Sequence, residues 1–196
     1  MRQQQPLTNT DTETMTDVQE PLFTDNTARR VEGGWEGTAR YSPGPEPAHR
    51  YALTRRWGEP GCELLRWVLC NPSTATEDVL DPTLRKTAKY TRRLGFGGML
   101  IHNIFALRST DPKALYAHPD PVGPENDAFL LSPGERVSSM VIAGWGTNGA
   151  FTGRGAAVRK MLVGAGADLR CLLVTKDGHP KHPLYCPDAA LFLPYR

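Results

Sequence analysis

The polar residues of this chain gather in short loops that directly follow apolar runs. The loop Asn71-Pro72-Ser73-Thr74 comes after one such run. Its proline restrains the backbone, while the Asn, Ser and Thr side chains offer hydrogen-bond donors and acceptors beside exposed amides. Such a loop is suited to holding a water molecule or an anion. The alternative is an ordinary turn at the end of a strand, because Asn-Pro commonly begins turns.

A second candidate is His182, which lies in the segment Gly178-His179-Pro180-Lys181-His182-Pro183-Leu184-Tyr185. Two prolines stiffen the backbone around an imidazole that can donate one hydrogen bond near neutral pH, which suits stabilisation of a leaving group. The His-x-x-His spacing also fits a metal pair, but no nearby Cys, Asp or Glu set completes a coordination shell, so we expect no metal. A structural histidine in a proline-rich loop is the remaining alternative.

Asn103 is an amide inside an otherwise apolar stretch. A buried amide without partners costs about 1–3 kcal/mol, so it must be satisfied in the folded chain. Its one acceptor and two donors match the Watson–Crick edge of a nucleobase, although a neighbouring loop would satisfy it equally well. Asp78, Asp81 and Asp111 are the carboxylates that we consider as bases.

The segment Gly144-Trp145-Gly146-Thr147-Asn148-Gly149 matches the G-x-G-x-x-G motif of dinucleotide-binding folds. In those folds an acidic residue ends the next strand, about 20 positions later. Here Asp168 precedes the apolar run Leu169–Thr175 instead of ending it. The motif therefore favours a dinucleotide only weakly, and we expect no cofactor.

Strands and helices alternate along the chain behind these loops. The predicted strands are 64–70, 98–105, 139–145 and 169–175, and the predicted helices are 81–94, one beginning at 124–127, and 155–163. This alternation predicts a three-layer α/β/α fold with a central, mainly parallel four-stranded sheet. The loops after the four strands, which begin at Asn71, Arg108, Trp145 and Lys176, are then expected to converge at one edge of the sheet.

The domain boundaries follow from composition. Residues 1–28 are rich in Gln, Thr and Asp with isolated apolar residues, which predicts a disordered tail, and residues 29–196 are expected to form a single domain. Within it, residues 31–51 have the turn-broken pattern of a lead-in or edge hairpin. No apolar run approaches the roughly 18 residues of a membrane span, and no secretory signal begins the chain, so we expect a cytoplasmic protein.

Charge and cysteine usage restrict the partners only loosely. Residues 51–196 hold 18 Lys/Arg and 13 Asp/Glu, a net charge of +5 (18 − 13). This excess is compatible with a phosphate-bearing substrate but far from the basic stripe of a dedicated nucleic-acid binder. The four cysteines show no C-x-x-C pair, and we expect free thiols that lie mostly in the core.

From about residue 51 to 185 the chain resembles a bacterial and phage domain family of unassigned function. The shared motifs are Asn71–Ala75, Asp81–Thr83, Asn103–Ala106, Thr110–Leu115, Pro121–Asp127 and His182–Tyr185.

The same order of motifs is similar to that of the uracil-DNA-glycosylase superfamily. The resemblance implies that Asn71 positions a hydrolytic water, that Asn103 reads a flipped base and that His182 donates to the departing base. Ser73 and Leu184-Tyr185 depart from the superfamily pattern, so the identity of the substrate is not carried over. The residues predicted to contact the base or substrate are Pro72, Ser73, Thr74, Asn103, Phe105, Trp145, Lys176, Pro183 and Tyr185, with Phe105, Trp145 and Tyr185 as the candidates for stacking.

These observations lead to the hypothesis of a monomeric, monofunctional DNA glycosylase with Asn71, His182 and Asp81 as catalytic residues. It would hydrolyse the N-glycosidic bond of a flipped, modified base, such as glucosylated hydroxymethylcytosine in phage DNA, and leave an abasic site in antiviral defence. An enzyme for free nucleosides or nucleotides in a phage base-modification pathway is one alternative. A non-catalytic nucleic-acid-binding module is another.

Overall fold

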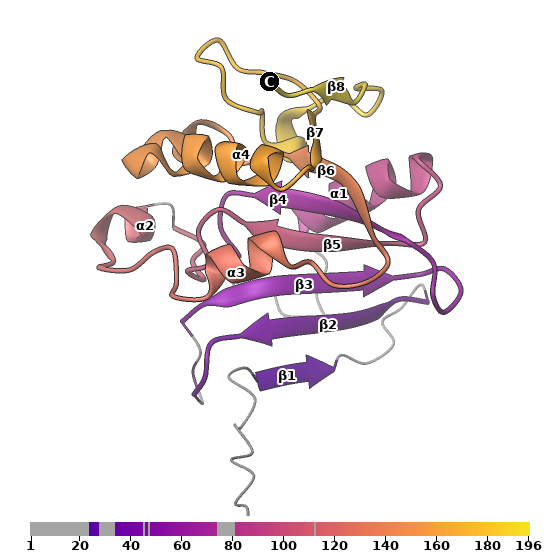
Figure 1. The fold of residues 1–196 in the computed structure, drawn as a ribbon, viewed down its shortest axis with the longest axis horizontal. Coiled ribbons are helices and arrows are strands. Elements are labelled where there is room, and N and C mark those ends of the chain that lie inside the picture. Colours follow the sequence, from indigo (N-terminus) through magenta and orange to yellow (C-terminus); the bar gives the residue numbers. More distant parts are fainter. Residues whose placement is uncertain (1–23, 28–33, 45, 47, 74–80, 112) are drawn as a thin grey trace, which may run out of the picture.

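A single mixed β-sheet organises the chain (Figure 1). The computed structural model describes residues 24–27, 34–44, 46, 48–73, 81–111 and 113–196. The sheet has eight strands in the order β1-β2-β3-β5-β4-β6-β7-β8. The strands are β1 (Thr24–Thr27), β2 (Glu36–Tyr41), β3 (Arg50–Arg56), β4 (Leu64–Leu69), β5 (Gly98–Asn103), β6 (Val137–Ala143), β7 (Asp168–Cys171) and β8 (Leu193–Pro194).

The prediction of a central, mainly parallel four-stranded sheet in the manner of uracil-DNA glycosylases was wrong. Four of the seven strand pairings, β1–β2, β2–β3, β3–β5 and β7–β8, are antiparallel, and only β4–β5, β4–β6 and β6–β7 are parallel. The sequence predicts a lead-in or an edge hairpin for residues 31–51 but does not show which strand this segment pairs with. The hairpin of β2 and β3 joins the sheet through β3, which pairs with β5 between Leu53 and Ile101.

A short strand lies within the N-terminal segment. Thr24–Thr27 form β1, which pairs with β2, although they fall inside the predicted tail of residues 1–28. Residues 1–23 and 28 of that segment lie outside the described residues.

Helices cover both faces of the sheet. They are α1 (Pro82–Arg93), α2 (Lys113–Ala117), α3 (Asn126–Leu131) and α4 (Arg154–Gly164), together with the 3₁₀ helices η1 (Thr147–Gly153) and η2 (Pro183–Tyr185). One apolar cluster joins Leu84 of α1 to Trp67 of β4, and a second joins Val158 of α4 to Val68 on the opposite face of that strand. Figure 1 shows α3 and α4 in front of the sheet and α1 behind it. In the described part of the chain, no helix has the length and apolarity to cross a membrane.

Local signals explain the start and end of α1. The Asp81 side chain accepts from the Leu84 amide as the N-cap, and Pro82 occupies the first turn, where its missing N–H costs nothing. Gly95 follows the last turn with a φ of 81°, a left-handed conformation that favours glycine.

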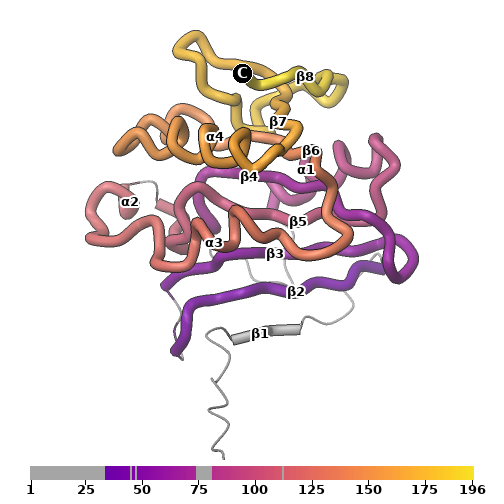
Figure 2. Tube along the Cα trace, in the orientation of Figure 1, coloured from indigo at the N-terminus to yellow at the C-terminus, as the bar shows by residue number. Residues whose placement is uncertain are grey.

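The strand order changes direction at β4. The chain runs from β4 through α1 to β5 on one side, and later returns to β6 on the other side of β4 (Figure 2). The loops after β4 and β6 therefore leave the sheet in opposite directions. Open α/β sheets bind ligands at such a switch point, outside the carboxyl ends of the strands.

Candidate functional site

A pocket of about 340 Å³ opens at this switch point. Its lining comes from the segments that follow three neighbouring strands, β4, β6 and β7. The lining residues are Cys70, Asn71, Trp145, Gly146, Thr147, Asn148, Thr175, Lys181, His182 and Tyr185. Four residues predicted from the sequence, Asn71, Trp145, His182 and Tyr185, thus meet in one place, which we call the carboxyl-end pocket.

Hydrogen bonds fix the orientation of the Asn71 amide. Its Nδ2 donates to the Ser109 carbonyl at 2.8 Å and to the Pro72 carbonyl at 3.2 Å. The Ser109 amide in turn donates to the Pro72 carbonyl at 3.0 Å, which ties the loop after β5 to the loop after β4. Since the amide nitrogen serves the loop, the carbonyl oxygen Oδ1 of Asn71 is the atom suited to accept a hydrogen bond from a ligand or water in the pocket.

The His182 ring is held as a neutral hydrogen-bond donor. Its Nδ1 accepts from the Leu184 amide at 3.4 Å at the start of η2. Burial lowers the pKa of His182, and the Asp81 carboxylate raises it to a smaller extent. A neutral imidazole whose Nδ1 accepts carries its proton on Nε2. His182 therefore offers an Nε2–H donor in the pocket without a positive charge.

Two close backbone approaches place the His182 loop. A Cβ at Gly144 would lie 2.8 Å from Cδ of Pro183, so only glycine lets the loop pack against the end of β6. The Gly146 amide donates to the Pro180 carbonyl at 2.8 Å. Pro183 is buried, and it acts as a packing residue beneath His182.

Asp81 stands beside the pocket rather than in its lining. Its Oδ1 accepts from the Leu84 amide at 2.7 Å, and its Oδ2 accepts from the Ser73 hydroxyl at 2.9 Å. Both carboxylate oxygens are thus engaged at the start of α1, and the charge acts on the pocket through space, as its effect on the pKa of His182 indicates.

Other predicted residues lie away from this lining. Asn103 is 3% exposed at the end of β5, in register with Leu69, and Phe105 is fully buried against Phe151 with ring centroids 5.8 Å apart. Lys176 is exposed next to Thr175. Thr74 and Asp78 lie outside the described residues.

The two aromatic residues of the pocket occupy different places. Trp145 is 2% exposed, and its ring packs edge-on against Tyr195 at 5.8 Å, so it forms the wall. Tyr185 is 69% exposed, and its ring centroid lies 5.8 Å from that of His182. Tyr185 is therefore the aromatic side chain at the mouth, available for stacking.

Sequence reasoning did not select Cys70, Thr147, Asn148, Thr175 or Lys181, which also line the pocket. Burial raises the pKa of Cys70 to about 12, so this residue is a neutral thiol, and Asn148 hydrogen-bonds to it. Their positions in the sequence could have indicated them, because Thr147 and Asn148 belong to the polar loop after β6 and Lys181 precedes His182.

The glycine motif around Trp145 has a packing role. The segment after Gly146 is the 3₁₀ helix η1, and α4 begins only at Arg154. A Cβ at Gly149 would lie 2.1 Å from Cδ1 of Trp145, and one at Gly155 would lie 2.7 Å from its Nε1. These glycines make room for the indole, which explains the motif without a dinucleotide.

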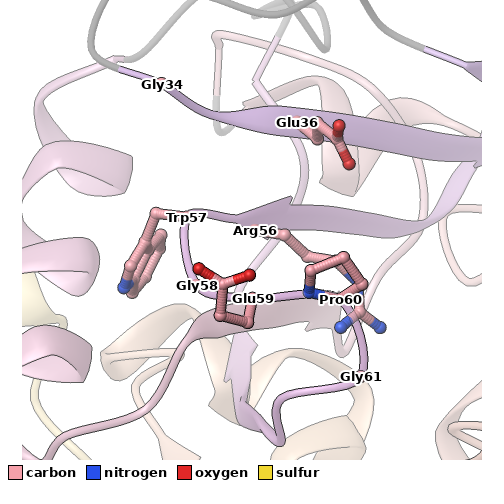
Figure 3. A pocket seen from close by; sticks show the side chains of 8 residues that line it. All are labelled: Gly34, Glu36, Arg56, Trp57, Gly58, Glu59, Pro60 and Gly61. Atoms are coloured by element: carbon pink, nitrogen blue, oxygen red, sulfur yellow. The ribbon is translucent and has the colours of Figure 1, made fainter.

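A second pocket, of about 420 Å³, lies at the opposite end of the sheet, and Figure 3 shows the residues that line it. Its lining comprises Gly34, Glu36 and residues 56–61, and Arg56 of β3 pairs with Gly98, the first residue of β5. Glu36 and Glu59 are exposed, and Arg56 donates to the Cys62 carbonyl at 3.2 Å. We call it the hairpin pocket. Across the described residues, no group of three or more His, Cys, Asp or Glu could hold a metal ion.

Comparison with known proteins places the chain in one family. Residues 50–184 match the family described as "Protein of unknown function (DUF1643)", and the chain belongs to it. No curated protein and no solved structure matches the chain. The resemblance to a family of unassigned function is therefore confirmed, while these comparisons give no support to the uracil-DNA-glycosylase superfamily.

Proposed function

We propose that this member of the DUF1643 family is a hydrolase that cleaves the N-glycosidic bond of a nucleobase in DNA. The observation that carries the proposal is the meeting of Asn71 and a neutral His182 in one pocket at the switch point of the sheet. The proposal takes from the glycosylase resemblance only this pair of residues and does not depend on a shared fold.

His182 suits the departure of the base. When the bond between C1′ and the base nitrogen breaks, the electron pair goes to the base, and negative charge develops on its carbonyl oxygen. A neutral Nε2–H donor stabilises that charge as it forms. Because burial lowers the pKa of His182, the imidazole keeps this neutral form near pH 7.

Asn71 suits the attack of water. An amide cannot remove a proton effectively, but its Oδ1 can orient a water molecule toward C1′ of the sugar cation. The water oxygen bonds to C1′, and its proton passes to solvent. Asp81 contributes its negative charge, which stabilises the cation without a direct proton transfer.

The rest of the lining suits a flipped base. A volume of about 340 Å³ falls in the range of about 300–1,000 Å³ typical of small-ligand sites, which leaves room for a modified pyrimidine. Asn148 and Thr147 offer polar groups for the base edge, and Lys181 offers one positive charge for a phosphate. Tyr185 at the mouth provides a face on which a base stacks. The substrate class that we propose is the modified bases of phage DNA. The biological role that we propose is antiviral defence.

The test is incubation of the purified protein with DNA that carries ordinary, hydroxymethylated or glucosylated cytosine, and with uracil-containing DNA. Mass spectrometry scores released bases and abasic sites. We expect release from one DNA, lost in Asn71→Ala and retained in Glu59→Gln, which alters only the hairpin pocket. No release from any DNA, with hydrolysis of free nucleosides or nucleotides instead, would replace the proposal with the mononucleotide alternative.

A further inference from the structure

Arg66 is a buried arginine to which the described chain gives no acidic partner. It lies in β4 and is 4% exposed. Its Nη2 donates to the Leu130 carbonyl, while its Nε is buried without a hydrogen-bond partner among the described residues. A guanidinium carries five N–H donors, and a buried charge is ordinarily paired. Burial lowers the pKa of Arg66 to about 10, which leaves it charged near pH 7.

Arg154 shows how this fold treats another buried arginine. It is 9% exposed, and its guanidinium forms an ion pair with Asp127 and donates from Nε to the Ile104 carbonyl at 2.8 Å. Unlike Arg154, Arg66 has no compensating negative charge within the described part of the chain.

A cavity of about 190 Å³ adjoins Arg66. Its lining includes the apolar side chains of Leu130, Val141 and Leu162 and the hydroxyl-bearing Ser138 and Ser139, and none of the described residues that line it is acidic. The Ser138 hydroxyl oxygen accepts from the Met140 amide at 3.3 Å, so its hydrogen can donate to a ligand. Since one water molecule occupies about 30 Å³, this volume corresponds to only a few water molecules. The cavity is therefore large enough for a small molecule but not for a polymer.

His102 adds a second unsatisfied polar atom on the same face of the sheet. It is 1% exposed, pairs with Val68 two residues along β4 from Arg66, and has its Nδ1 without a hydrogen-bond partner in the described chain. Burial and the Arg66 charge hold the pKa of His102 well below its usual value. This region therefore combines the positive charge of Arg66 with two buried nitrogen atoms, Arg66 Nε and His102 Nδ1, that lack hydrogen-bond partners among the described residues.

We propose that the cavity beside Arg66 binds the carboxylate or phosphate group of a small molecule, with Arg66 and the hydroxyls of Ser138 and Ser139 as donors. The site is separate from the carboxyl-end pocket: Arg66 and Asn71 are five residues apart on β4 and its extension, about 16 Å at 3.3 Å per residue. The inference does not depend on the proposed glycosylase activity.

The test follows the arginine Nε–H resonances of the ¹⁵N-labelled full chain by NMR. The signal of Arg66 is assigned by through-bond correlation of its side chain with the backbone resonances of the folded chain. Acetate and inorganic phosphate are titrated separately at an ionic strength held constant with chloride. We expect a saturable shift of the Arg66 signal by one of the two anions, with a Kd on the order of 1 mM or tighter.

Variants separate the site from general effects of charge. The double change Ser138→Ala and Ser139→Ala keeps Arg66, and we expect it to raise the Kd for the anion several-fold without unfolding the chain. Arg170→Lys changes an arginine already paired with Asp168 at 2.9 Å, so the Arg66 response should persist. An Arg66 signal that moves with neither anion, or a shift unaffected by the double serine change, overturns the proposal, and neither result requires a substitution of Arg66.

Discussion

The carboxyl-end pocket and the hairpin pocket are of similar size but differ in construction. In the carboxyl-end pocket, Asn71 and His182 are each oriented by hydrogen bonds to the backbone, and Pro183 packs closely against Gly144. In the hairpin pocket, Glu36 and Glu59 are exposed carboxylates on a strand and a turn. The two pockets therefore differ in the orientation of their donors and acceptors rather than in volume, and this difference is the reason that we propose the carboxyl-end pocket as the reactive one.

The largest effect is expected at Asn71. Asn71→Ala removes the group that we propose to orient water, and we expect kcat/KM for base release to fall by about 10²–10³-fold, as for loss of one positioned hydrogen-bonding group. Steady-state release of the base measures it. If Glu36→Gln in the hairpin pocket reduces base release as much, the assignment of the activity to the carboxyl-end pocket is wrong.

Gly144→Ala tests the close approach that places His182. A Cβ there would lie 2.8 Å from Pro183, and such overpacking is expected to lower the free energy of unfolding by about 1–3 kcal/mol. Urea unfolding followed by circular dichroism measures it. Gly164→Ala is the matched control, because no atom lies within 4 Å of its added Cβ, and unchanged or slightly raised stability is expected.

Tyr185→Ala tests stacking at the mouth. Stacking on an aromatic ring is worth about 1–3 kcal/mol per base, so we expect the Kd for single-stranded substrate DNA to rise by about tenfold or more. The residue is 69% exposed, so its removal should leave the urea midpoint unchanged. Tyr185→Phe should retain binding, and equal losses in both variants would argue for the hydroxyl instead of the ring.

The pH dependence of stability tests the state of His182. Because burial lowers its pKa, the unfolded chain takes up a proton on this residue at a higher pH than the folded chain. Its contribution to stability is complete above the unfolded pKa of about 6.5 and is lost as pH falls from there through the lower folded value. His182→Gln should therefore lose stability less steeply on acidification, as measured by urea unfolding at several pH values. Parallel curves for the two proteins would contradict a lowered pKa.

Local signals in the sequence predicted several elements well. The apolar run that becomes β4 and the Asp-Pro start of α1 were both expected, since burial and capping depend on neighbouring residues. The partner strand of the β2–β3 hairpin was not predicted, because the hairpin's position depends on pairing with β5, whose residues are more than 40 positions away from β3.

The same distinction applies to the site. Asn71 was found because it follows the apolar run of β4, and His182 was found because prolines flank it in the loop after the last predicted strand. The position of Phe105 depends instead on the path of the chain after β5, where its amide donates to the Cys70 carbonyl at 2.9 Å and its side chain enters the core. Sequence pattern does not show which way a side chain turns after a strand ends.

Trp145 gives the carboxyl-end pocket an optical reporter of its own. Its buried indole lines the pocket, and its Nε1 has no hydrogen-bond partner among the described residues. Indole emission responds to nearby polarity, so a ligand that displaces water beside this ring should alter its fluorescence. The other three tryptophans are Trp35, Trp57 and Trp67, none of which lines this pocket, and changing them to phenylalanine would isolate the signal. Binding of unlabelled nucleosides, nucleotides or oligonucleotides could then be followed by the emission of the protein itself, whether or not the bound molecule reacts.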